Sequence, residues 1–120
     1  MAFRIMAWSL AIALTALTLV PPGLRPVTGL PHVVEHLAAF VAAGIALALA
    51  YRRHVAFLFA GTVVWTGALE LAQLLVPGRH SRLSDFLVDA AGVCAAIRLV
   101  AAGSRLSLID RSERRIKSGN

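Results

Sequence analysis

Three ionisable residues, His36, Glu70 and Asp89, lie within hydrophobic stretches of this sequence. An imidazole and two carboxylates can bind amines, hydroxyls or water, can transfer protons, or can coordinate a metal ion. Burying such groups in an apolar environment costs free energy, so their presence indicates a structural or functional role. Three further polar residues complete the predicted ligand-binding set: Gln73, Arg79 and Asp85.

The spacing of these residues places them on shared helix faces. Residues three or four positions apart lie on the same side of an α-helix. His32, Glu35 and Ser84 are secondary candidates because each lies next to a member of the set or one helical turn from it. Three pairs have helical spacing: Glu70 with Gln73, Asp85 with Asp89, and His32 with His36.

Four apolar runs must position these side chains. The 120-residue chain is 58% hydrophobic and 15% charged, which would leave a soluble domain of this size with too little polar surface. Each run is close to the roughly 17–25 residues that a membrane-spanning helix needs. The runs are Ile5 to Val20, Val33 to Ala50, Val55 to Val76 and Leu83 to Ala102.

The segments between the runs are too short to hold a soluble domain. Pro21-Pro22-Gly23 ends the first run, Tyr51-Arg52-Arg53-His54 separates the second from the third, and Pro77-Gly78 follows the third. Short connections favour consecutive helices that lie side by side and antiparallel. We therefore predict an all-α integral membrane protein with a four-helix up-and-down bundle over residues 1–103 and a basic cytoplasmic tail over residues 104–120.

The distribution of positive charge predicts the orientation. The chain has 12 Lys and Arg against 6 Asp and Glu, a net charge of +6. Most of the cations flank one side of the four runs, and positive loops stay in the cytoplasm. Both termini are therefore expected in the cytoplasm. The first run is expected to be retained as a helix, because Leu19-Val20-Pro21-Pro22 is a poor site for signal-peptide cleavage.

In this topology the three ionisable residues reach one depth. His36 lies about 7 Å below the outer surface, Glu70 about 8 Å and Asp89 about 9 Å, at a rise of 1.5 Å per residue. The second, third and fourth helices thus each bring one ionisable side chain to a shared level. Arg79, in the loop above, is expected to pair with the carboxylates.

Small residues predict where helices pack closely. Small side chains repeated every four residues let two helix backbones approach each other. Ala38, Ala42, Ala46 and Ala50 form such a face on the second run, and Gly92 with Ala96 on the fourth.

Five segments of the chain form a recognisable pattern: Glu35-His36-Leu37-Ala38-Ala39-Phe40, Glu70-x-x-Gln73, Pro77-Gly78-Arg79, Ser84-Asp85 and Asp89-x-x-Gly92. In order and spacing they resemble the VanZ-like membrane proteins over roughly Leu30 to Ala96. The resemblance implies several membrane helices, a role in the bacterial cell envelope, a location in the cytoplasmic membrane and no settled activity, with the founding member linked to teicoplanin resistance. This chain has His32-Val33 where the family often has Asp-Lys, and Asp89 where Asn is common.

The interpretation we favour is a binding site for the polar head of an envelope amphiphile, a lipid-linked precursor or a lipoglycopeptide-like molecule. Arg79 would engage an anionic group, while His36 and the carboxylates would bind amines, hydroxyls or water. The expected partners are membrane lipids or a lipid-linked envelope molecule, with no cofactor. A homo-oligomer is left open. No stretch supplies the basic face of a nucleic-acid-binding domain.

Other interpretations stay open. An intramembrane enzyme would use Glu70 or Asp89 as base and His36 as proton shuttle, although no nucleophile motif accompanies them. A metal site would use His32, His36, Glu70 and Asp89, but the histidine pair lacks the Glu of a His-Glu-x-x-His motif, so no metal is predicted. A third alternative is a purely structural polar network that fixes helix packing.

Overall fold

Four α-helices make up the part of the chain that the computed structural model describes, residues 1–21, 24, 29–76 and 82–118, with the side chains of residues 32, 108, 113 and 118 left aside. The all-α prediction is confirmed, and these described ranges contain no strand. The first three helices begin and end within three residues of the predicted runs. The helices are α1 (Ala2–Leu19), α2 (His32–Ala50), α3 (Val55–Gln73) and α4 (Leu83–Ser118).

Prolines and a charged turn set the helix ends. Val20, the residue after α1, is extended at φ −67° and ψ 134°, because the ring of Pro21 disfavours the helical conformation in the residue before it. Pro31 precedes the first residue of α2. Proline lacks a backbone N–H, but an N–H at the start of a helix has no partner within the helix, so no hydrogen bond is lost. His54 ends the Arg52-Arg53 turn and is the residue before α3.

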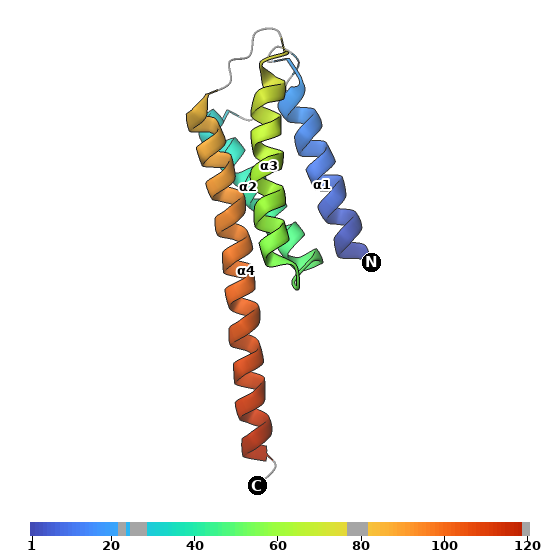
Figure 1. The fold of residues 1–120 in the computed structure, drawn as a ribbon, viewed down its shortest axis with the longest axis vertical. Coiled ribbons are helices and arrows are strands. Elements are labelled where there is room, and N and C mark those ends of the chain that lie inside the picture. Colours follow the sequence, from blue (N-terminus) through green and yellow to red (C-terminus); the bar gives the residue numbers. More distant parts are fainter. Residues whose placement is uncertain (22–23, 25–28, 77–81, 119–120) are drawn as a thin grey trace.

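The helices alternate in direction, as predicted for an up-and-down bundle (Figure 1). α1 and α3 run one way, and α2 and α4 run the other way. The N-terminus and the α2–α3 turn lie at the same end of the bundle, and α4 continues past that end (Figure 1). We refer to this as the N-terminal end and to the other as the distal end.

Contact between helices departs from simple sequential pairing. The most extensive contact joins α2 to α4, which run parallel, whereas the consecutive helices α2 and α3 touch only slightly. Two glycines explain the close pair: a Cβ at Gly44 would lie 2.7 Å from the carbonyl oxygen of Val93, and one at Gly92 would lie 2.9 Å from Cδ1 of Leu37. The absence of side chains at these positions lets the backbones of α2 and α4 approach.

The predicted alanine face of α2 is only partly the contact face. Ala46 is buried, but Ala38 and Ala42 are exposed. The expectation for α4 is met, since Gly92 and Ala96 are buried. Gly44 is the reason for the difference, because it brings α4 against a neighbouring face of α2 rather than against the full row of alanines.

The outer surface of the bundle is hydrophobic. On α3, Phe57, Val64 and Leu71 are 80%, 71% and 68% exposed, whereas Thr66 and Glu70 are buried. A helix with apolar residues outside and polar residues inside suits a lipid environment and not water. Within the described residues, four helices are long and apolar enough to cross a membrane. The chain is thus a multi-pass membrane protein.

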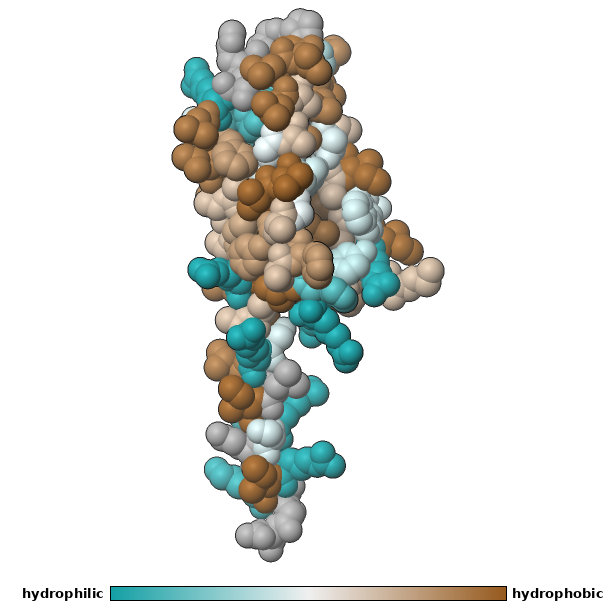
Figure 2. All heavy atoms as spheres, viewed as in Figure 1, coloured by the Kyte–Doolittle hydropathy of each residue, from teal (hydrophilic) through white to brown (hydrophobic). Residues whose placement is uncertain are grey.

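The last helix extends far beyond the bundle. α4 passes through residue 104, the predicted start of the tail, and continues to Ser118. The molecule therefore measures 68 Å along its longest axis and 26 and 25 Å across it. Figure 2 shows mostly hydrophobic side chains over the bundle, hydrophilic ones at both of its ends, and hydrophilic ones interspersed with hydrophobic ones along this extension.

Candidate functional site

A buried histidine and a buried aspartate connect α2 to α4. Nδ1 of His36 lies 3.1 Å from Oδ2 and 3.3 Å from Oδ1 of Asp89. His36 is 5% exposed and Asp89 is 2% exposed. Two residues that are 53 positions apart in the sequence therefore form a polar contact inside the bundle.

Polar residues also follow one face of α3. Thr62, Thr66, Glu70 and Gln73 are spaced four, four and three residues apart, and each is at most 5% exposed. The two threonine hydroxyls donate hydrogen bonds within the helix, to the carbonyl oxygens of Leu58 at 2.7 Å and Val63 at 3.0 Å. Glu70 and Gln73 are thus the part of this face whose side chains can serve other partners.

An aromatic pair provides a reference level within the bundle. The rings of Phe40 on α2 and Trp65 on α3 have centroids 5.5 Å apart. His36 lies four residues from Phe40 and Glu70 five residues from Trp65, both toward the distal end. They lie about 6 and about 7.5 Å beyond the ring pair, at 1.5 Å per residue. Since Asp89 contacts His36 directly, all three ionisable groups share one level, as the sequence predicts.

Thr18 on α1 is a buried polar residue outside the predicted ligand-binding set. Indole Nε1 of Trp65 donates to Oγ1 of Thr15 at 3.1 Å, and Thr18 follows one turn further toward the distal end. Thr18 is 1% exposed. The i,i+3 spacing of Thr15 and Thr18 was the sequence signal for this face, in a run whose other hydroxyl residue is Ser9. All four helices therefore contribute to what we call the polar layer: Thr18, His36, Glu70, Gln73 and Asp89.

Two polar atoms of this layer lack hydrogen-bond partners. Nε2 of Gln73 and Oγ1 of Thr18 are buried and contact no acceptor or donor of the described residues within hydrogen-bond distance. A buried polar group without a partner costs about 1–3 kcal/mol, and native proteins contain few of them. A bound molecule or water with its own donors and acceptors would remove this cost, so the layer is suited to receive a polar group.

The remaining predicted residues either lie nearer the distal end of the bundle or are outside the described residues. Asp85 is half-buried and accepts a hydrogen bond from the hydroxyl of exposed Ser84 at 3.2 Å. Glu35 is also half-buried. Arg79 and the side chain of His32 lie outside the described residues. The structure thus brings four of the predicted residues into the bundle interior, namely His36, Glu70, Gln73 and Asp89.

The layer does not form a metal site among the residues that can be described. No group of three or more His, Cys, Asp or Glu side chains gathers there in a metal-binding arrangement.

Comparison with known proteins identifies one family. Residues 3–104 match the family model described as VanZ/LLP1. The match spans nearly all of α1, the whole of α2 and α3, and α4 as far as Ser104, and so includes every predicted ligand-binding position. No curated protein and no solved structure matches the chain.

Proposed function

The chain belongs to the VanZ/LLP1 family, and we propose that its polar layer binds the polar head group of a cell-envelope amphiphile. The ligand is a lipid-linked precursor or a lipoglycopeptide-like molecule, whose acyl or polyprenyl chain stays in the surrounding lipid. Ionisable residues inside a membrane-spanning bundle are most often functional. The layer combines the imidazole of His36, two carboxyl groups and the amide of Gln73. These groups can hydrogen-bond to amines, hydroxyls and carbonyl groups.

The observation on which the proposal depends is the pair of buried polar atoms without partners. Nε2 of Gln73 offers donors, and Oγ1 of Thr18 offers a donor and an acceptor. Gln73 lies on α3 and Thr18 on α1, and both residues belong to the polar layer. A head group that hydrogen-bonds to both would satisfy groups that the protein leaves unsatisfied.

The charge distribution supports an outer-leaflet position for this site. The basic residues of the α2–α3 turn and of the α4 extension lie at the N-terminal end. By the positive-inside rule this end faces the cytoplasm, and the polar layer then lies in the outer half of the bilayer. An amphiphile of the outer leaflet could enter laterally between helices, with Arg79 engaging its anionic group. A link to teicoplanin resistance is part of this proposal, since a lipoglycopeptide joins an acyl chain to a polar head.

Mass spectrometry of lipids that stay with the protein in mild detergent tests the proposal. Wild-type protein is expected to retain one class of envelope amphiphile. The isosteric Thr18→Val change removes an unpartnered hydroxyl, so it should preserve the fold and lower retention about tenfold, the effect of one hydrogen bond. Thr66→Val is the matched control, because the Thr66 hydroxyl donates to a carbonyl of its own helix. Bulk phospholipids alone, retained equally by all three proteins, would refute the proposal.

A structural role for the layer is the second candidate, favoured by the direct contact between His36 and Asp89. Buried polar contacts can fix the register of packed helices. In that case Asp89→Asn should lower the stability of the bundle and leave the set of retained lipids unchanged. The enzyme interpretation, with Glu70 or Asp89 as base, is tested by the same lipid analysis, because a chemically altered head group would support it.

A further inference from the structure

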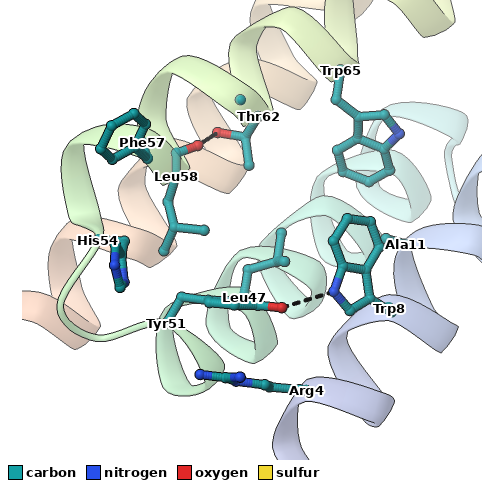
Figure 3. Close-up of a pocket in the computed structure, with 11 residues that line it drawn as sticks. Arg4, Trp8, Ala11, Leu47, Tyr51, His54, Phe57, Leu58, Thr62 and Trp65 are labelled. Carbon is teal, nitrogen blue, oxygen red and sulfur yellow. Dashed lines mark hydrogen bonds between the residues drawn. The ribbon is translucent and has the colours of Figure 1, made fainter.

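A cavity lies between α1, α2 and α3 on the N-terminal side of the polar layer (Figure 3). Its volume is about 580 Å³. It extends from His54, the residue before α3, along that helix to Trp65, and the Phe40–Trp65 ring pair lies between it and the level of His36 and Glu70. The cavity and the polar layer are therefore two distinct sites.

The interior of this cavity is apolar. Ala11, Leu47, Leu58 and Gly61 line it together with the rings of Phe57, Trp8 and Trp65. The Thr62 hydroxyl, which also lies at its wall, donates to backbone carbonyls of α3. An occupant would therefore meet hydrocarbon and aromatic surfaces and few groups to which it could hydrogen-bond, as an acyl chain requires.

The mouth of the cavity is basic. The guanidinium carbon of Arg4 lies 5.2 Å from the centre of the Tyr51 ring, a cation–π geometry. Tyr51 is itself held in place, because indole Nε1 of Trp8 donates to its hydroxyl oxygen at 2.9 Å (Figure 3). His54 lies at the same end, and the described lining residues include no Asp or Glu. Arg52 and Arg53 follow Tyr51 in the exposed turn.

The dimensions of the cavity fit one leaflet of a bilayer. From His54 to Trp65, α3 rises about 16 Å at 1.5 Å per residue. This is about half of a hydrocarbon core roughly 30 Å thick. A lipid whose phosphate lies at Arg4 would thus have its chain beside Trp8 and Leu58, and its chain end near Trp65.

We propose that this cavity binds an anionic phospholipid of the leaflet at the N-terminal end, with an acyl chain between α1 and α3 and the phosphate at Arg4 and His54. Zwitterionic lipids should bind less tightly, because the positive charge of their head groups is repelled by the basic residues at the mouth of the cavity. The site is independent of the head-group site proposed above, since it uses other residues at the other end of the bundle.

Native mass spectrometry with two defined lipids tests this proposal. The full-length protein is mixed with equal amounts of dioleoyl-phosphatidylglycerol and dioleoyl-phosphatidylcholine, and the bound fraction of each is measured. Wild-type protein is expected to prefer the anionic lipid. Arg4→Gln should reduce that preference about fivefold, since a basic residue near a membrane surface contributes about that much attraction for anionic lipid. Arg105→Gln is the control, because it removes the same charge from the exposed start of the α4 extension.

A second pair of variants tests the acyl-chain part of the site. A Cβ at Gly61 would meet no atom within 4 Å, so the side chain of Gly61→Leu can occupy the cavity without a backbone clash. It should lower binding of the anionic lipid, whereas Gly103→Leu, at an equally open position outside the cavity, should not. Equal lipid preference in Arg4→Gln and Arg105→Gln, or cross-links showing that a second copy of the chain fills the cavity, would overturn the proposal.

Discussion

His36 on α2 and Asp89 on α4 contact each other inside the bundle, with Nδ1 of the imidazole 3.1 Å from Oδ2 of the carboxyl group. The two helices run parallel and lie close together at Gly44 and Gly92. The close approach of the backbones and the polar contact are therefore parts of one interface. Perturbing either one should affect the other.

Removal of the Asp89 carboxyl group should destabilise this interface. Asp89→Ala deletes the acceptor that lies next to His36 and should lower the free energy of unfolding by about 1–3 kcal/mol. Asp89→Asn keeps the shape and one acceptor oxygen and should cost about 1 kcal/mol. Equilibrium unfolding in detergent, followed by circular dichroism, measures both. Equal losses for the two variants, or no loss in either, would contradict this role of the contact.

Substitution of Gly44 should separate α2 from α4. The Cβ of Gly44→Ala would lie 2.7 Å from the carbonyl oxygen of Val93 and 2.9 Å from Cβ of Ala96, so the backbones must shift. We expect a loss of about 1–3 kcal/mol, typical of overpacking. Gly61→Ala is the matched control, since its Cβ meets nothing within 4 Å and should leave stability equal or higher.

The free energy of unfolding of Gly92→Ala should lie between those of Gly44→Ala and Gly61→Ala. The nearest atom to its Cβ is Cδ1 of Leu37, the end of a flexible side chain that can rotate away. Unfolding experiments on the three variants should therefore find Gly61→Ala the most stable, Gly92→Ala intermediate and Gly44→Ala the least stable. If Gly92→Ala were less stable than Gly44→Ala, contacts between side chains, and not the approach of the two backbones, would determine how closely α2 and α4 pack.

Both termini should lie in the cytoplasm, because the α2–α3 turn and the α4 extension are basic. An alkaline phosphatase fused after Asn120 should be inactive, whereas one inserted after Gly29, in the α1–α2 connection, should be active. A fluorescent protein that matures only in the cytoplasm provides the reciprocal measurement at the same two positions. Active phosphatase at Asn120 would place the polar layer in the inner leaflet and contradict the proposed route of ligand entry.

The spans and the level of the polar groups could be predicted from the sequence, because both depend on local rules. Pro21 and the Arg52-Arg53 turn mark helix ends, and a fixed rise per residue gives the depth of His36 and Glu70. This information is contained in each run by itself, so it does not depend on how the helices pack.

The helix pairing and part of the site could not be predicted in this way. Several small-residue rows offer similar packing faces, and only the assembled bundle shows that Gly44 is in contact with α4 while Ala38 and Ala42 are exposed. Burial of Thr18 follows from the rotation of α1 against its neighbours, which hydrophobic periodicity does not determine when both faces of a helix are apolar.

Titration of the purified protein in lipid nanodiscs with teicoplanin and with a polyprenyl-diphosphate-linked wall precursor tests the central claim most directly. The claim predicts saturable binding of at least one probe, weakened about tenfold or more by Glu70→Gln. Asp110→Asn should have no effect, because that acid is exposed on the α4 extension and paired with Arg114. Absence of saturable binding, or equal affinity in the wild type and Glu70→Gln, would contradict a head-group site in the polar layer.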